Sequence, residues 1–444
     1  MIGKKKFRQI LALGSLLAML VAFAPLFAGA TSLAGDGEIL PADTLFYVPK
    51  PNHGAVEQIA DLISGGDKTS AYLIEQMIDT PQSVWFGGGT PHQVQQEVKN
   101  TVKRAAGKGT VPVLVAYNIP FRDCAQFSAG GATTVEEYTA WIDGFAAGIG
   151  NEAAVVILEP DGLGIIPWYD PYGSGDGSNA LEWCQPPEAD PETAAAERFL
   201  MLNYAVDALE AQPNVSVYLD GTHSAWLGVG DAAHRLMQAG VDRADGFFLN
   251  VSNYQFRANL VQYGTWISSC LASATTPADF AACPNQYWNG GPPGTKIADL
   301  LGPWTGVALS PFGEWSDETD VPEFNTSGLN VRYAGTQPTT HFVLDTSRNG
   351  VGPWQPPAYP DPQDWCNPPD RGLGLQATAD TGLPLVDAYL WIKIPGESDG
   401  ECTRGLGPAG TTMDPEWGLI DPPAGQWFPE MALDLVNNAT PPLP

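Results

Sequence analysis

Two aspartates directly follow apolar runs in this chain, and their positions suggest paired-carboxylate chemistry. The run Val155–Leu158 leads into Glu159, Pro160 and Asp161, and the run Val111–Tyr117 leads within a few residues to Asp123. Apolar, mostly β-branched runs of this length are typical of buried strands. A buried parallel strand that delivers a carboxylate at its C-terminal end is the geometry by which α/β barrels build active sites.

Two carboxylates surrounded by aromatic residues fit the hydrolysis of an acetal. That reaction needs a proton donor at the leaving oxygen and a second acid that acts as nucleophile or base. The apolar strand beneath Asp161 should raise its pKa by desolvation, and an ionised Asp123 would act in the same direction. Indole rings match the flat C–H faces of sugars, and the chain has 14 tryptophans. We therefore predict cleavage of glycosidic bonds, with Glu159 as a structural acid at the rim.

Other catalytic chemistries find little support in the sequence. No Gly-x-Ser-x-Gly motif accompanies a plausible histidine partner, and the 5 histidines do not pair at metal-ligand spacing. The glycine run Gly87–Gly89 lacks the Gly-Lys-Ser/Thr of a phosphate loop. We expect no metal and no cofactor.

Alternating strand and helix patterns must position these acids. Helical patterns cover 94–106, 134–148 and 191–211, and three connections (180–191, 255–340 and 349–384) exceed ordinary loop lengths. Strand–helix alternation implies a parallel sheet with right-handed crossovers, and the number of units favours a closed α/β barrel. The predicted strands are Ser83–Phe86, Val111–Tyr117, Val155–Glu159, Val215–Asp220, Gly246–Val251, His341–Asp345 and Asp387–Lys393.

The chain begins with a pattern typical of a secretory signal peptide. Basic residues at 4–8 precede an apolar stretch at 10–27 and the small residues 28–30. A membrane anchor is the alternative, which Pro25 and the small residues after it disfavour. We predict a signal peptide at 1–30, a short extension at 31–42, a catalytic barrel at 43–438 and a tail at 439–444.

Charge and localisation limit the partners. Residues 1–30 contain four basic and no acidic residues, so their removal changes the net charge from −29 to −33. A protein with this much net negative charge repels nucleic acid and anionic membranes. We expect a secreted, extracellular monomer that binds neither nucleic acid nor, after signal removal, a membrane.

The 6 cysteines of a secreted chain most simply form three disulfides. Cys270 and Cys283 are close in sequence and share one long insertion, so we expect them to pair. The other four, for which several pairings are open, are Cys124, Cys184, Cys366 and Cys402. A metal site is the rival interpretation, but the cysteines lack Cys-x-x-Cys spacing.

Six blocks of the sequence together resemble glycoside hydrolase family six, and they occur in the same order as in that family. The resemblance covers nearly the whole chain after residue 30. It implies a distorted seven-stranded parallel β/α barrel that hydrolyses β-1,4-glucan with inversion, so cellulose or a soluble β-1,4-glucan would be the bound partner. The blocks are Tyr117–Cys124, Leu158–Asp161, Asp220–Trp226, Asn250–Tyr254, Asp345–Gly350 and Trp391–Gly400.

The resemblance also implies roles for individual residues. Asp161 would be the general acid, Asp123 would tune its pKa and arrange water, and Asp399 is the candidate base, although water could relay the proton. Tyr117 would press on the distorted sugar ring, and Arg122 would orient the aspartates. Arg348 would have a supporting role. Sugar subsites would be lined by Trp85, His223, Trp226, Trp365, Lys393 and Glu397, with Asn250 as a further sugar-binding candidate. The implied disulfides are Cys124–Cys184 and Cys366–Cys402.

The mode of attack depends on the loops. Segments 255–340 and 349–384 resemble the tunnel-forming insertions of exo-acting bacterial members, so we expect a cellobiohydrolase that acts from non-reducing ends. An endoglucanase with an open cleft is the alternative. Two other classes are a non-catalytic glucan-binding protein, which the joint presence of Asp123, Asp161 and Asp399 disfavours, and a wall protein, which the lack of repeats disfavours.

Overall fold

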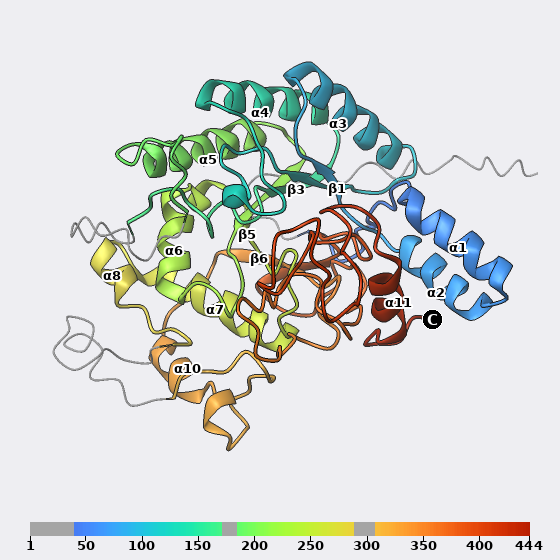
Figure 1. Ribbon diagram of the computed structural model, residues 1–444. Coiled ribbons are helices and arrows are strands. Elements are labelled where there is room, and N and C mark those ends of the chain that lie inside the picture. Colours follow the sequence, from blue (N-terminus) through green and yellow to red (C-terminus); the bar gives the residue numbers. More distant parts are fainter. Residues whose placement is uncertain (1–39, 171–183, 288–306) are drawn as a thin grey trace, which may run out of the picture.

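The computed structural model describes residues 40–170, 184–287 and 307–444, and its centre is a parallel sheet (Figure 1). The seven strands are ordered β1 to β7, and each is hydrogen-bonded to the next along the chain. Each observed strand overlaps one predicted range, so the predicted barrel of parallel strands is confirmed. The strands are β1 (Val84–Phe86), β2 (Val113–Ala116), β3 (Ala154–Leu158), β4 (Val215–Asp220), β5 (Gly246–Leu249), β6 (His341–Asp345) and β7 (Val386–Leu390).

The first and last strands meet without forming a ladder. Among the described residues, β1 pairs only with β2 and β7 only with β6. The Ser83 N–H donates to the carbonyl of Trp391 at 2.9 Å, and Trp85 Nε1 donates to the carbonyl of Ile392 at 2.8 Å. The barrel is therefore distorted, because single bonds at the strand ends replace a seventh ladder.

Helices cover the outside of this sheet and return the chain to the start of the next strand (Figure 1). The three predicted helices are present as α3 (Pro91–Ala106), α4 (Val135–Ile149) and α5 (Ala194–Glu210). Helix α3 begins where Thr90 and Gln93 form a reciprocal capping box, and it ends with two basic residues, which suit the negative end of the helix dipole. Helix α6 (Val229–Gln238) follows β4.

The connection 255–340 differs from the prediction of one long loop. Its described part contains α7 (Arg257–Ser273), α8 (Pro277–Ala281) and α10 (Ser327–Tyr333). Helix α7 is buried on several sides, because Gly264, Ser268 and Ser269 are buried in addition to the apolar stripe that runs from Leu260 to Cys270. A helix buried all round shows no clean polar and apolar faces, which is why its pattern is hard to recognise in the sequence.

The two ends of the described chain pack against each other. Helices α1 (His53–Gly65) and α2 (Lys68–Ile78) form a hairpin beside α11 (Pro429–Asn437), as Figure 1 shows. Ile74 and Met77 from α2 share a buried apolar cluster with Leu435. The predicted signal peptide, and most of the predicted extension after it, lie outside the described residues.

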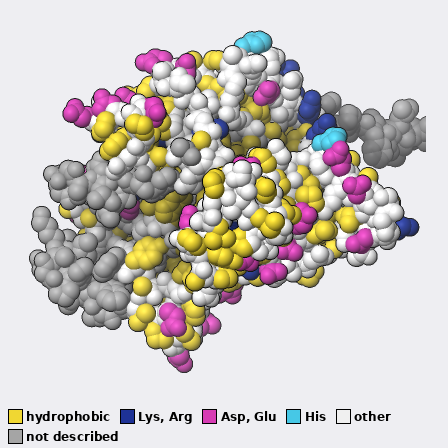
Figure 2. Space-filling view, in the orientation of Figure 1, with side chains coloured by type: hydrophobic (Ala, Val, Ile, Leu, Met, Phe, Trp, Pro, Cys, Tyr) yellow, Lys and Arg dark blue, Asp and Glu magenta, His cyan; other side chains and the backbone are white. Residues whose placement is uncertain are grey.

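The surface carries many more acidic than basic groups, in line with the net charge of −29. On the face shown in Figure 2, Asp and Glu side chains are scattered and Lys and Arg are few. In the part of the chain that the structure describes, no helix is long and apolar enough to cross a membrane.

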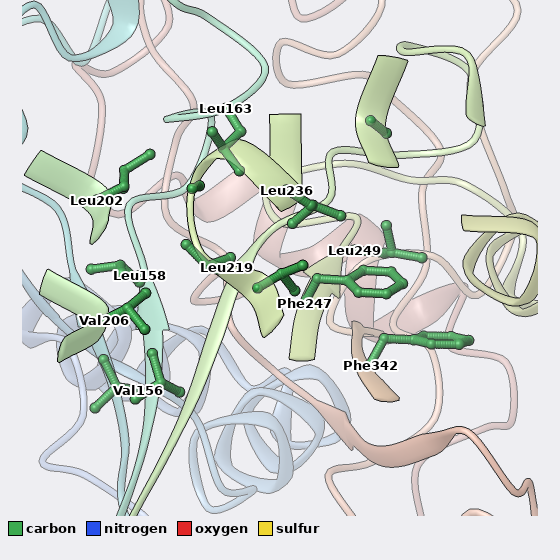
Figure 3. Close-up of a cluster of buried hydrophobic side chains, with 14 of the residues drawn as sticks. Val156, Leu158, Leu163, Leu202, Val206, Leu219, Leu236, Phe247, Leu249 and Phe342 are labelled. Atoms are coloured by element: carbon green, nitrogen blue, oxygen red, sulfur yellow. The ribbon is translucent and has the colours of Figure 1, made fainter. Parts of the chain in front are cut away.

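Alternating side chains of the strands build two apolar layers. On β3, Val155 and Ile157 point into the barrel interior, while Val156 and Leu158 join the cluster between sheet and helices. Figure 3 shows this outer layer, where α5 contributes Leu202 and Val206, α6 contributes Leu236, and the strands contribute Leu219, Phe247, Leu249 and Phe342. Both faces of the central strands β2 to β5 are therefore buried, which leaves the strand ends as the positions for polar chemistry.

All six cysteines form disulfides in the structure. The bonds join Cys124 to Cys184, Cys270 to Cys283, and Cys366 to Cys402. The first joins the loops that follow β2 and β3, and the third joins the loops that follow β6 and β7.

Candidate active site

The C-terminal ends of the strands surround one cleft with a volume of about 680 Å³. Eleven of the twelve predicted catalytic and sugar-binding residues line it: Trp85, Tyr117, Arg122, Asp123, Asp161, His223, Trp226, Trp365, Lys393, Glu397 and Asp399. The twelfth, Asn250, lies behind the wall. Its Nδ2 donates to the carbonyl of Asp345 at 2.9 Å and its Oδ1 accepts from the Gln255 N–H at 2.9 Å. Asn250 therefore supports the wall, where a sugar contact was predicted.

Strained backbone marks the strand ends. Asp123, Glu159 and Asp161 have φ angles of 58°, 52° and 63°, in the left-handed region that residues other than glycine seldom adopt. Such conformations each cost of order 1–3 kcal/mol and persist where the surrounding structure holds them. Their concentration at these acids is typical of a functional site.

Asp161 is buried in an environment that favours its protonated form. Burial raises its pKa well above the usual range, and the charges of Asp220, Asp123 and Asp399 act in the same direction. The positive charge of Lys393 acts in the opposite direction, with a smaller effect. A carboxyl in this environment stays protonated where an exposed aspartate would be ionised.

Asp123 lies in the loop that follows β2, and a main-chain N–H of the same loop binds its carboxylate. Its Oδ2 accepts the Ser128 N–H at 2.6 Å. Burial raises the pKa of Asp123 to about 6, although that N–H and the charge of Arg122 lower it. Asp123 is therefore a carboxyl that changes charge in the mildly acidic range, beside the more strongly perturbed Asp161.

Arg122 acts on the loop and makes no recorded ion pair with an aspartate among the described residues. Its Nη1 donates to the carbonyls of Gly87 and Tyr117, and its Nε donates to the Ser128 carbonyl at 2.9 Å. Its guanidinium carbon lies 4.5 Å from the centre of the Tyr117 ring. Arg122 thus fixes the segment whose N–H group binds Asp123, so any orientation of that acid is indirect.

Glu159 is structural, in keeping with its interpretation from the sequence. The side chain is fully buried, and its carboxylate accepts the N–H of Asn118 at 2.9 and 3.0 Å and that of Ile119 at 3.0 Å. Burial raises the pKa of Glu159 to about 7, against these hydrogen bonds. It holds the chain between Tyr117 and Asp123.

Asp220 is an acid to which the sequence assigned no role, although it too ends a strand. Its Oδ2 accepts the N–H groups of Leu163 and Gly164, each at 3.1 Å, and its Oδ1 accepts that of Thr222 at 2.8 Å. The carboxylate therefore holds the loop that follows Asp161. Burial raises the pKa of Asp220 to about 6. Its position at the end of β4 was the available signal.

Asp399 has an environment opposite to that of Asp161. Its Oδ2 accepts from Arg348 Nη1 at 2.9 Å and from the Tyr254 hydroxyl at 3.2 Å, and its Oδ1 lies 3.3 Å from Lys393 Nζ. Burial alone would raise its pKa, but the charges of Arg348 and Lys393, together with the hydrogen bonds from Arg348 and Asn367, lower the pKa of Asp399. This carboxyl is ionised at neutral pH.

Aromatic side chains form the rest of the walls. Trp85 meets Tyr117 edge to face with ring centres 5.2 Å apart, and His223 lies 5.7 Å from Trp226. Phe127 was not predicted from the sequence; its ring centre is 6.0 Å from that of Trp365. Nor were Phe312 and Trp354, which line the cleft from the long connections.

Glu397 and the acids near Cys402 complete the polar groups. Glu397 Oε1 accepts from Asn52 Nδ2 at 2.7 Å, which ties the cleft to the start of α1. Cys402, Asp414 and Asp421 are close enough to suggest cation ligands. However, the Cys402 sulfur is in a disulfide and Asp414 pairs with Arg404 at 2.7 Å, so the donor set does not fit a metal ion.

Comparisons with known proteins agree on one family. The model of "Glycosyl hydrolases family 6" matches residues 41–439. The chain is 30% identical over 413 residues to endoglucanase A of Thermobispora bispora, covering 93% of this chain and 66% of that protein, just under two thirds. It is 30% identical to a probable 1,4-beta-D-glucan cellobiohydrolase C of Aspergillus niger, covering 81% of this chain and 69% of that protein.

A solved structure extends the likeness to three dimensions. The endoglucanase Cel6 from Mycobacterium tuberculosis, in complex with a methyl-cellobiosyl-thio-cellobioside, is 31% identical with a TM-score of 0.59. The match covers 89% of this chain and 98% of that one.

Proposed function

The chain belongs to glycosyl hydrolase family 6, and we propose from this premise that it hydrolyses β-1,4-glucosidic bonds of cellulose or soluble glucans with inversion. The relatives named above are called endoglucanases and cellobiohydrolases, and one solved relative holds a cellobioside ligand. Carboxylates and aromatic rings around one cleft are the groups that such a reaction needs.

The observation that carries the proposal is the separation of two acids in one cleft. The pKa of Asp161 is raised well above its usual range, while that of Asp399 is lowered. Acids whose environments push their pKa values apart can serve as proton donor and proton acceptor at the same pH. We assign Asp161 as the general acid, which protonates the leaving glycosidic oxygen.

Water then attacks the anomeric carbon from the opposite face. Asp399 is the proposed base, which accepts the proton of that water directly or through a second water. Asp123 raises the pKa of Asp161 and helps to arrange the water, and its own pKa of about 6 lets it share in the transfer. The negative charges of Asp399 and Asp123 also stabilise the positive charge that develops on the sugar ring.

The remaining cleft residues hold the sugar. Tyr117 packs against Trp85 and is steadied by Arg122, so it can press on the ring at the cleavage point. We propose that sugar subsites are formed by Trp85, His223, Trp226, Trp365, Lys393 and Glu397. Burial lowers the pKa of His223 to about 3, so His223 offers neutral hydrogen-bonding groups.

For the mode of attack we propose release of cellobiose from non-reducing ends. Its support is the contact between Phe127 and Trp365, whose ring centres at 6.0 Å leave no room for a sugar between them. The two rings belong to different loops, each of which is held by a disulfide. Their contact therefore narrows the path by which the middle of a glucan chain could enter the cleft from the side. Endo action is the alternative, and it is supported by the bacterial relatives, which are named endoglucanases.

Secretion and monomeric action complete the proposal. We propose that residues 1–30 form a signal peptide, that 43–438 form the catalytic barrel, and that the extracellular enzyme acts as a monomer without cofactor. The three disulfides support secretion, because such bonds persist in oxidising compartments.

The test uses Asp161→Asn on cellohexaose, with ¹H NMR of the first product. The parent should release cello-oligosaccharides as α-anomers, and the variant should lose at least about 10²-fold in kcat, since general acid catalysis contributes about 10²–10⁴-fold. A β-anomer would contradict inversion, and an unchanged rate would contradict the assignment of the acid. A rapid fall in the viscosity of carboxymethylcellulose with little soluble sugar would replace the exo mode by the endo mode.

A further inference from the structure

Asn367 directly follows Cys366 in one of the two loops that the Cys366–Cys402 disulfide joins, and it is fully buried. Its φ of 40° places it in the left-handed region. It does not line the cleft and makes no contact with the open space above Asp161. A buried asparagine in a strained conformation needs all its polar groups satisfied, so the partners of this side chain show what it does.

Asn367 binds Asp399 in both directions. Its Oδ1 accepts the main-chain N–H of Asp399 at 2.7 Å, and its own N–H donates to Asp399 Oδ2 at 3.0 Å. The first bond fixes the backbone that carries the carboxylate, and the second fixes the carboxylate itself. Left-handed φ at Asn367 is what turns both groups toward the same neighbour.

The amide nitrogen is anchored on the far side. Asn367 Nδ2 lies 3.0 Å from Ser398 Oγ, 2.9 Å from the Gly400 carbonyl and 2.8 Å from Asp421 Oδ2. Two of these acceptors belong to the residues on either side of Asp399. The side chain therefore grips residues 398–400 as a unit, and its two N–H groups are both used.

The main-chain carbonyl of Asn367 is anchored as well. It accepts from Trp417 Nε1 at 2.7 Å and from Arg404 Nη2 at 3.2 Å. Arg404 is itself paired with Asp414. The hydrogen bonds from Arg404 and Trp417 thus fix the position of Asn367, so Asn367 can in turn fix the position of Asp399.

We propose that Asn367 is the residue that positions Asp399 for the hydrolysis proposed above, so that the carboxylate meets the attacking water at one fixed place. The inference rests on the proposed function, because Asp399 has a role only if the chain is a glycoside hydrolase. Arg348 and Lys393 supply the charge that keeps Asp399 ionised, whereas Asn367 supplies its geometry.

The experiment compares two variants of Asn367 with a matched control in the full chain. Asn367→Gly keeps the left-handed backbone without strain but removes the grip on 398–400. Asn367→Asp keeps the acceptor for the Asp399 N–H but turns a second carboxylate oxygen toward Asp421. Asn259→Asp is the control, since Asn259 is also fully buried and hydrogen-bonded, on α7.

The charges around Asn367 make the pH profile informative. Asp421 faces its amide, Arg404 faces its carbonyl and pairs with Asp414, and Asp399 faces its N–H. Burial raises the pKa of Asp421 to about 7. In Asn367→Asp the new carboxyl and Asp421 can share one proton at low pH, which restores the hydrogen bond between the two side chains. This proton is lost as the pH rises, and the hydrogen bond is lost with it.

kcat and KM on cellohexaose are measured from pH 4 to 9, at a temperature at which every variant is folded by circular dichroism. Asn367→Gly should lose about tenfold or more in kcat, with KM within about twofold, because misplaced catalytic groups cost turnover. Asn367→Asp should be near the parent at pH 4–5 and lose about tenfold by pH 8, relative to both the parent and Asn259→Asp.

The outcomes separate the two proposals. If the parent hydrolyses glucan and Asp161→Asn does not, but both Asn367 variants keep kcat within twofold at every pH, Asn367 is only structural and the inference is overturned. If the parent releases no sugar, the proposed function itself fails. A pH-dependent loss of kcat that Asn259→Asp shows equally would also overturn the inference, since it would reflect a general effect of a buried charge.

Discussion

A pair of acids, Glu210 and Asp245, lies near the N-terminal ends of β4 and β5 and offers a test of the electrostatics that is independent of catalysis. Glu210 ends α5 and Asp245 precedes β5, whose partner strand β4 supplies the Val217 N–H bound by Asp245 Oδ2 at 2.8 Å. Burial and the neighbouring Asp245 raise the pKa of Glu210 from 4.5 to about 8. The two carboxyls therefore share a proton, and Glu210→Gln would replace that proton with a permanent amide N–H.

The sign and size of the effect follow from this shift. A carboxyl whose pKa is raised on folding costs no stability below its unfolded pKa, and destabilises increasingly as the pH rises from 4.5 to about 8. At 1.36 kcal/mol per unit the upper bound is ~5 kcal/mol. Glu210 is partly exposed and shares its proton with Asp245, so we expect about 2 kcal/mol once solvent screening is taken into account.

Urea unfolding from pH 5 to 9.5, with the disulfides intact, measures this difference. The parent and Glu210→Gln should have the same free energy of unfolding within about 0.5 kcal/mol at pH 5, as is usual for changes away from special features. By pH 9 the variant should be more stable by about 2 kcal/mol. Glu430→Gln, at an exposed position of α11, is the control and should give a constant difference. A gap between Glu210→Gln and the parent that does not widen with pH would refute the shared proton.

Two further outcomes concern the cleft. Asp220→Asn removes a charge that raises the pKa of Asp161, so the alkaline limb of kcat should move to lower pH by about one unit, measured on cellohexaose; an unmoved limb would exclude this coupling. Phe127→Ala removes the ring in contact with Trp365 and should raise the ratio of viscosity loss to soluble sugar on carboxymethylcellulose, whereas an unchanged ratio would show that this contact does not control access.

The strands and the acids at their ends were predictable because their signals are local. An apolar run followed by polar residues identifies both a buried strand and the side chains it delivers, and this holds for Asp123, Asp161 and Asp399. The order of parallel strands then brings those ends to one rim. Eleven of the twelve predicted catalytic and sugar-binding residues line the cleft for this reason.

The residues that were missed act across large distances in sequence. Asp220 holds the loop at Leu163, 57 positions away, and Asn367 holds Asp399 from 32 positions away. Asn250 was placed on the wrong side of the wall, because a motif gives the residue type but not the direction of the side chain. Such contacts depend on how loops pack, and no periodicity in the chain encodes them.

The pairing of cations explains why the cleft can hold acids of opposite function. Arg348 and Lys393 both contact Asp399, at 2.9 and 3.3 Å, and the pKa of that acid falls. The charges of Asp220, Asp123 and Asp399 raise the pKa of Asp161, and Lys393 opposes them with a smaller effect. Because the same low-dielectric site strengthens both effects, assigning the two cations to one carboxylate is sufficient to separate a proton donor from a proton acceptor. Removing one of these cations, as in Arg348→Met, should therefore raise the pKa of Asp399 and shift the acid limb of kcat to higher pH. An unshifted limb would mean that Asp399 is not the base.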